Sequence, residues 1–236
     1  KMKATKLAIA LLAATGISAI ATPVMAYEAG DWLVRGRILH ISPNDDSGRL
    51  YVNDAALAKG VEVDSDTIPE LDITYMITPH WGVELILGYS EHTVSGNKTV
   101  GSAISANAFA TGTNKDVIDT KVLPPTLLLQ YHFAPNSNIR PYVGAGINYT
   151  YFFDEKVPGS SAVAGAGDSI DLDSSWGFAV QAGVDIAIND DWFVNADVKY
   201  IDIDTEAHFT DTALGKLSIN ADIDPVVWGV GVGRRF

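Results

Sequence analysis

Five histidines are the residues of this chain best suited to bind a metal ion or to transfer a proton. They are His40, His80, His92, His132 and His208. They are scattered over different segments, none forms an HxxxH pair, and the chain has no cysteine to complete a zinc site. The sequence therefore predicts no metal site and no cofactor.

Ser90, His92 and Ser95 place two possible nucleophiles near a possible base. Hydrolysis or transfer of a lipid acyl chain needs such a pair, usually oriented by a carboxylate. A nucleophile and its base meet in space, however, so closeness along the chain is weak evidence. The sequence predicts that the protein is not an enzyme, and a lipid-modifying enzyme stays the less favoured alternative.

Two runs of alternating acidic residues are the remaining candidates for cation binding. Neither run contains the glycine-bent loop of an EF-hand. We expect solvated carboxylates, although loop acids near an anionic surface could share divalent cations with it. The residues are Asp168, Asp171, Asp173, Asp202, Asp204 and Glu206.

The first 26 residues have the features of a secretory signal peptide. Three lysines stand within the first six positions, a mostly apolar stretch follows at 7–21, and Val24 and Ala26 have the spacing that signal peptidase needs. The alternative, a membrane-spanning helix, is disfavoured because Gly16 and Pro23 interrupt the stretch. We predict a signal peptide at 1–26 and a mature chain at 27–236.

The mature chain is strongly acidic. Without the three lysines of the signal, 13 cationic residues face 29 acidic ones, a formal charge of −16. This balance predicts no nucleic-acid partner, because phosphate binding needs clustered cations. No later stretch reaches the roughly eighteen uninterrupted apolar residues of a helical span. Any membrane crossing must therefore use strands.

Segments of alternating polarity predict eight strands, an even number as in single-chain bacterial barrels. Three predicted connections are tight turns rich in Pro, Asn and Asp, and the other four are long. Short periplasmic turns and long extracellular loops are typical of a transmembrane β-barrel, so we predict an all-β, eight-stranded antiparallel barrel of this kind. The predicted strands are 32–42, 70–77, 82–90, 126–133, 142–153, 176–188, 192–203 and 226–236.

Each predicted strand has an apolar face and a mixed face. In 192–203, for example, Val194 and Val198 alternate with Asn195 and Asp197. A soluble lipocalin-like barrel shows the same alternation with the apolar face inward. We favour an apolar face that contacts lipid, because aromatic residues gather near both ends of the strands, as they do at the two membrane interfaces.

Seven short strings, spread over nearly the whole mature chain, are shared in order and spacing with one known family. The longest is Arg140-Pro141-Tyr142-Val143-Gly144-Ala145-Gly146-Ile147-Asn148-Tyr149, and Ser175-Trp176-Gly177 is another. Together they resemble the OmpW family of small outer-membrane β-barrel proteins. The resemblance implies the outer membrane of a Gram-negative bacterium and a narrow apolar channel for small hydrophobic molecules, which leave sideways through the wall.

The family also implies a role for the last residue. Phe236 is similar to the terminal aromatic residue that the outer-membrane assembly machinery recognises. Arg234 stands where the family usually has another aromatic residue, so assembly should depend mainly on Phe236.

Inward positions nearer the long connections are the candidates for lining the channel. We assign Leu39, Met76, Ile86 and Leu128 to this lining, with simple filling of the core as the alternative. Lys199 is also inward, where the family often places a bulky apolar residue. The channel is therefore not expected to be purely apolar.

Deeper inward charges are predicted to pair into a polar plug that closes the periplasmic half. A buried charge must find a partner or become neutral, so pairing is expected. These residues are Arg35, Arg37, Glu84, Asp185, Asp197 and Arg235.

The expected partners are outer-membrane lipids, lipopolysaccharide and small hydrophobic solutes. The alternative function is a structural or host-contact barrel that acts through its extracellular loops. Deletion of loops would then abolish adhesion without changing uptake.

Overall fold

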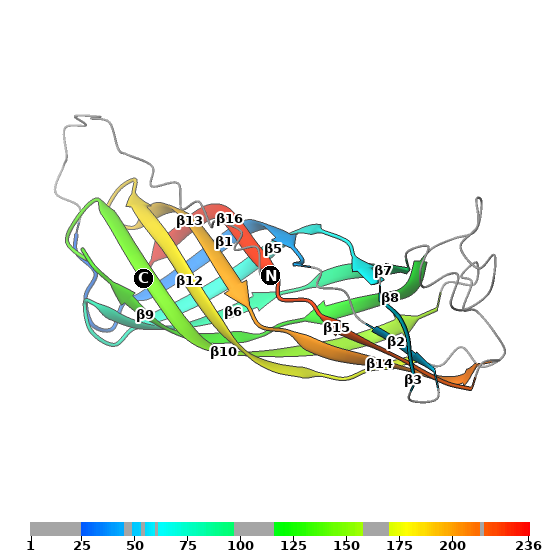
Figure 1. Cartoon of the computed structure of the whole chain (residues 1–236). Coiled ribbons are helices and arrows are strands. Elements are labelled where there is room, and N and C mark those ends of the chain that lie inside the picture. Colours follow the sequence, from blue (N-terminus) through cyan, green and yellow to red (C-terminus); the bar gives the residue numbers. More distant parts are fainter. Residues whose placement is uncertain are drawn as a thin grey trace, which may run out of the picture.

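The computed structural model describes residues 25–44, 49–52, 55–59, 61–96, 116–157, 170–212 and 215–236. Figure 1 shows these ranges as an elongated molecule built of strands. Within them, no helix has the length and apolar character needed to cross a membrane. The predicted signal peptide falls almost entirely outside the described residues, so its cleavage stays a prediction.

Eight strands form a closed barrel. In ring order they are β12, β13, β16, β1, β5, β6, β9 and β10, and pairing of β10 with β12 closes the ring. Every neighbouring pair is antiparallel, so each barrel strand has a partner on both sides, as hydrocarbon requires. Their bounds are β1 (Trp32–Ser42), β5 (Asp66–Met76), β6 (Trp81–Gly88), β9 (Thr126–His132), β10 (Ile139–Lys156), β12 (Ser175–Ala187), β13 (Trp192–Ile201) and β16 (Val226–Arg235).

The eight predicted strands are confirmed. The bounds of β1 agree with prediction at both ends, whereas β5 begins at Asp66, four residues earlier than predicted. β10 is longer than predicted by three residues at each end. The start of β1 and the C-terminal residue meet at the short-turn end, where the Phe236 amide donates to the Trp32 carbonyl at 2.8 Å.

In their described parts, the four long connections contain eight further strands, which the sequence did not predict. We call these strands the extension, because they continue the wall beyond the barrel on the side opposite the short turns (Figure 1). The upper part of β10 leaves β9 and pairs with β8 from Tyr151 onward. The extension comprises β2 (Arg49–Val52), β3 (Ala55–Lys59), β4 (Val61–Val63), β7 (Ser90–Gly96), β8 (Asp116–Leu123), β11 (Ile170–Leu172), β14 (Asp204–Thr212) and β15 (Gly215–Asp222).

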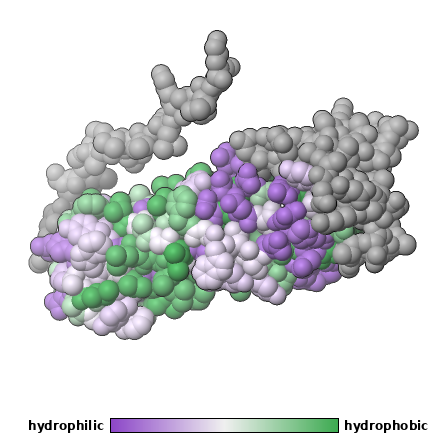
Figure 2. All heavy atoms as spheres, turned by 60° about the horizontal axis from the view of Figure 1, so that its bottom comes forward, coloured by the Kyte–Doolittle hydropathy of each residue, from purple (hydrophilic) through white to green (hydrophobic). Residues whose placement is uncertain are grey.

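The outer face of the barrel is apolar. Ile38, Ile147 and Val230 are each more than half exposed although they are large hydrophobic residues. Figure 2 shows this surface as a hydrophobic zone over the barrel, with hydrophilic surface toward the extension. Aromatic pairs lie at the short-turn end, where the rings of Trp32 and Tyr75 are 4.9 Å apart. This arrangement is that of a lipid-facing wall.

The inner face changes character along the axis. In the barrel, inward residues of β13 include the buried Asn195, Asp197 and Lys199. In the extension most of the buried residues are apolar, such as Val94 and Ile118, and the buried polar ones are uncharged serines and threonines. The interior is therefore polar where the outside is apolar, and apolar where the chain has passed beyond the barrel.

Two inward glycines leave space for rings in the crowded barrel interior. A Cβ atom at Gly183 would collide with the ring of Tyr142, and one at Gly233 would collide with the ring of Phe193. Both rings are almost fully buried. Small residues at these places allow neighbouring strands to bring large side chains into a narrow lumen.

Candidate functional site

The inward residues of β1 sample every layer of the interior. From the short-turn end they are Leu33, Arg35, Arg37, Leu39 and Ile41, and the first four are buried. The first belongs to a small apolar cluster, the next two to a charged layer, and the last two to a larger apolar cluster. Because every second residue of a strand faces inward, the inward residues of β1 show the order of the layers along the lumen.

A small apolar cluster closes the short-turn end. It consists of Tyr27, Leu33, Met76 and Phe193. The hydroxyl of Tyr27 donates to Asp185 Oδ2 at 3.0 Å, and its ring lies 4.1 Å from the guanidinium carbon of Arg140. Tyr27 is also tied by its amide to the carbonyl of Pro135. The segment that precedes β1 is thereby fixed inside the barrel end.

A charged layer lies above this cluster, that is, farther from the short-turn end, and we call it the plug. Its lower part is centred on Arg35, which lies 2.8 Å from Asp185 and 3.2 Å from Glu84. Its upper part is centred on Arg37. The plug consists of Arg35, Arg37, Glu70, Asp72, Glu84, Asp185, Asp197 and Lys199, all buried.

Arg37 holds three carboxylates at once. Its guanidinium nitrogens lie 2.6 Å from Glu70, 2.6 Å from Asp72 and 2.7 Å from Asp197. Lys199 Nζ contacts Glu70 at 2.6 Å and Asp197 at 3.7 Å. The planar guanidinium, with its five donors, is the side chain best suited to such a shared position.

The plug has more carboxylates than cations, and neutral donors supply the difference. Gln181 Nε2 donates to Glu84 at 2.7 Å, and Asn195 Nδ2 donates to Asp185 at 2.8 Å. Hydrogen bonds of this kind stabilise two buried carboxylates that share one cation, Arg35. The layer forms a connected network that fills the lumen.

An apolar pocket lies within the extension, beyond the plug. Its lining comes from the ends of the barrel strands and from β7, β8, β11, β14 and β15, and it includes Phe152, Leu172 and Ile219. Among the described residues, the lining contains no Asp, Glu, Lys or Arg. The cavity volume is about 80 Å³, well below the several hundred Å³ of a typical drug-sized site. It therefore suits a slim apolar molecule.

A second hollow lies in the barrel wall between β12, β13 and β16. It is lined by the outward Val180, Val198 and Val226 and also by the inward Gln181 and Lys199. This hollow lies at the level of the upper plug.

The comparisons with known proteins agree with this architecture. The model of the OmpW family matches residues 28–236. The chain is 39% identical to outer membrane protein W of Vibrio cholerae serotype O1, over the whole of both chains. This chain belongs to the OmpW family.

Solved structures and a more distant relative extend the comparison. The crystal structure of the outer membrane protein OprG from Pseudomonas aeruginosa matches with a TM-score of 0.78 and 34% identity, covering 90% of this chain and 99% of that one. The dibenzothiophene metabolism operon protein PahQ of Pseudomonas aeruginosa is 27% identical, covering 92% of this chain and 93% of PahQ. This OmpW-family chain is an outer-membrane barrel of a Gram-negative bacterium.

The residues predicted to line the channel of this OmpW-family barrel separate into three places. Leu39, Ile86 and Leu128 belong to the large apolar cluster that continues into the pocket, but they lie below its lining. Met76 was expected nearer the long connections, and this position is wrong, because it lies in the cluster at the short-turn end. Lys199 belongs to the plug. Their role in passage stays a prediction.

Of the six residues predicted to pair into the plug, five are confirmed to pair there. Arg235 is the exception. It lies at the rim, where it donates to the Ala26 carbonyl at 2.6 Å and approaches Asp31 at 3.7 Å. The alternation of the last strand correctly predicted that Arg235 faces inward. Because Arg235 is the second-last residue, however, it lies at the end of the barrel.

Sequence reasoning missed Glu70 and Asp72, the two carboxylates that β5 contributes to the plug. The signal was present in the alternation of Glu70, Asp72 and Thr74 along one face of the strand. The start of β5 was predicted at the first of these residues, which left its inward face too short to recognise.

His80 and His132 lie next to each other, with His80 Nδ1 2.7 Å from the His132 carbonyl, and two more histidines have polar contacts. His92 Nε2 accepts from Ser90 Oγ at 3.0 Å inside the pocket. Asp173, Glu206 and His208 lie together, with candidate ligand atoms within 4.8 Å of one another. They are exposed or half-exposed on β14 and beside β11, with His208 Nε2 3.5 Å from Asp173 and His208 Nδ1 3.9 Å from Glu206.

Proposed function

We propose that this protein is an outer-membrane channel for small hydrophobic molecules, which enter the apolar pocket of the extension and leave sideways through the barrel wall. The observation that carries this proposal is the apolar pocket above a plug of paired charges. An apolar solute gains free energy by leaving water for such a pocket. The name of PahQ links one relative to the metabolism of dibenzothiophene, itself an apolar compound.

The plug supports an exit through the wall. A hydrophobic molecule that moved straight down the lumen would have to separate the ion pairs of Arg35 and Arg37 and leave buried charges without partners. That separation costs several kcal/mol per pair. The short-turn end is closed as well, by Tyr27 and Phe193.

The wall hollow between β12, β13 and β16 supplies a place for that exit. Its lining joins the inward Lys199 and Gln181 to the outward Val180 and Val198. A solute that passes here moves from an apolar pocket to acyl chains without entering bulk water. We propose it as the lateral exit.

Uptake by cells tests the proposed function. Cells that make the protein should take up radiolabelled octane faster than cells with an empty vector. Ala207→Phe, which places a ring among the pocket's lining residues, should return uptake to near the vector level. Ala145→Phe is the matched control, because Ala145 is exposed on the outer face of β10. If both variants take up octane at the wild-type rate, the pocket is not the route.

We also propose that Phe236 is recognised by the outer-membrane assembly machinery and that lipid and lipopolysaccharide surround the wall. Phe236 is 62% exposed at the end of the chain, with Arg234 stacked 4.7 Å from its ring centre. Phe236→Ala should lower the fraction of protein that reaches the membrane in its heat-modifiable folded form, whereas Phe236→Tyr should not. Equal folding of both purified variants in micelles would assign the defect to recognition. Normal assembly of Phe236→Ala in cells would contradict the proposal.

A further inference from the structure

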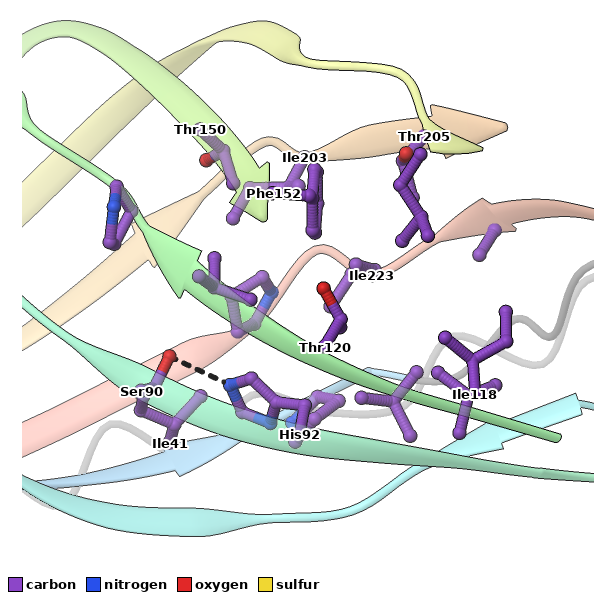
Figure 3. A pocket seen from close by; sticks show the side chains of 18 of the residues that line it. Ile41, Ser90, His92, Ile118, Thr120, Thr150, Phe152, Ile203, Thr205 and Ile223 are labelled. Atoms are coloured by element: carbon purple, nitrogen blue, oxygen red, sulfur yellow. Dashed lines mark hydrogen bonds between the residues drawn. The ribbon is translucent and has the colours of Figure 1, made fainter. Parts of the chain in front are cut away.

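The pocket contains one pair of polar groups that face each other within its lining. Ser90 and His92 both line the pocket, and the Ser90 hydroxyl is hydrogen-bonded to His92 Nε2 at 3.0 Å. Figure 3 shows this contact as a dashed line, at the side of the pocket formed by β7. Ser90 is 2% exposed, so water does not compete freely for its hydroxyl.

The other hydroxyl groups of the lining are directed to partners outside it. Thr150 donates to Asn148 Oδ1 at 2.6 Å, and Thr205 donates to the Asp173 carbonyl at 2.8 Å. Thr120 donates to the Lys121 carbonyl at 3.4 Å. Ser90 and His92 are therefore the described pair whose hydrogen bond lies wholly within the pocket lining.

The contacts of His92 settle which of its nitrogens is an acceptor. Nδ1 lies 3.1 Å from the backbone carbonyl of Asp64, which can only accept, so Nδ1 carries the hydrogen. Burial lowers the pKa of His92, which favours the neutral ring. Nε2 is then a free acceptor, and the Ser90 hydroxyl donates to it.

This pair matches the hydrogen-bonding capacity of an alcohol. A ligand hydroxyl can donate to His92 Nε2 while it accepts from Ser90, so that one hydrogen bond is replaced by two and no polar group is left unpaired. An alkane offers nothing to the pair. A carboxylate would enter a lining that has no cation among its described residues, and would lose its hydration without a partner.

We propose that the pocket selects slim apolar molecules that carry one neutral hydroxyl group, with Ser90 and His92 as the residues that bind that hydroxyl. This inference rests on the proposed function, because it names the class of molecule that the channel accepts. The rest of the lining holds the hydrocarbon chain. The preference is for alcohols over alkanes and over carboxylates of the same length.

Binding to the full chain in lipid nanodiscs tests the selectivity. The isoleucine methyl signals of Ile118 and Ile203, which line the pocket, are followed by NMR during titration with 1-octanol, octane and octanoate. Ser90→Ala and His92→Phe should weaken apparent binding of 1-octanol about three- to tenfold, the size of one or two hydrogen bonds. Binding of octane should not change. Partition into the lipid is common to all variants and cancels in the comparison.

Ser95→Ala is the matched control. Ser95 lies on the same strand, but its hydroxyl donates to Asp116 at 3.0 Å and it does not line the pocket. The proposed selectivity would be overturned if Ser95→Ala weakened octanol binding as much as the pocket variants do. It would also be overturned if neither pocket variant altered octanol binding. Octane that shifts neither methyl signal and is not taken up by cells would instead contradict the proposed function.

Discussion

Arg37 is the residue whose surroundings best explain why the plug is stable. Three carboxylates contact its guanidinium within 2.7 Å, and none of these side chains is more than slightly exposed. Lys199 contacts two of these carboxylates, Glu70 and Asp197. Each of the two therefore keeps its contact with Arg37 if Lys199 is replaced. The two cations are therefore unequal, although both are inward and both are buried.

Replacement of Arg37 by methionine should be far more damaging than the same change at Lys199. Arg37→Met leaves Asp72 without a cation and removes one from Glu70 and Asp197, which we expect to cost about 3–5 kcal/mol of unfolding free energy. Lys199→Met should cost less, because Glu70 keeps its contact with Arg37. Urea unfolding in lipid measures both, and Arg234→Met, on the exposed face, is the control. Equal losses at the two positions would show that the plug does not depend on the geometry of Arg37.

Residue types and period-two spacing predicted much of the site but not its depth. Arg35, Arg37 and Asp197 were assigned to the plug because a charge on the inward face of a barrel needs a partner. The depth of Met76 was misjudged, since alternation fixes the face of a residue and not its height in the lumen. The closeness of Ser90 and His92 along the chain was given little weight, because a nucleophile and its base meet in space. Their contact arises because both lie on one face of β7, a strand that the sequence did not predict.

At the scale of elements, the strands of the barrel were predictable and those of the extension were not. The barrel strands place apolar residues outward, which is the pattern that was sought. In β7 and β8 the buried residues include the apolar Val94 and Ile118, while Thr93 and Asp119 face outward. Their alternation has the opposite sense, because the solvent outside them is water. Polar outward residues and long spacing made these strands resemble loops.

Gly183 of β12 lies against side chains of the neighbouring strands, so a substitution there tests how tightly the barrel interior is packed. Gly183→Val should destabilise the fold by about 1–3 kcal/mol, because its side chain would collide with the buried ring of Tyr142 and with Asp197 Cβ. Ala182→Val, at the neighbouring exposed position of the same strand, should have little effect. Thermal unfolding in micelles measures the difference. A stable Gly183→Val protein would mean that the ring of Tyr142 can move aside.

The whole molecule is organised by the two environments outside it. Where the outer surface is apolar, the lumen holds paired charges, and where the chain extends further, the lumen becomes an apolar pocket. The change occurs at the level of Leu39, Ile86 and Leu128, just above the plug. A hydrophobic solute therefore finds apolar surroundings inside the extension and, lower down, outside the barrel. Passage sideways through the wall connects the two.

That arrangement predicts which outward positions contact lipid. The chain has no cysteine, so single cysteines can carry spin labels without competing thiols. Labels at Val230→Cys and Ile147→Cys, whose native side chains are 56% and 54% exposed, should be relaxed by oxygen, which concentrates in lipid, and shielded from a water-soluble nickel chelate. A label at Asp119→Cys, outward on β8 in the extension, should behave in the opposite way. If the nickel chelate reached all three sites equally in nanodiscs, the apolar surface would not be lipid-facing. The sideways route would then have no acyl chains to lead into.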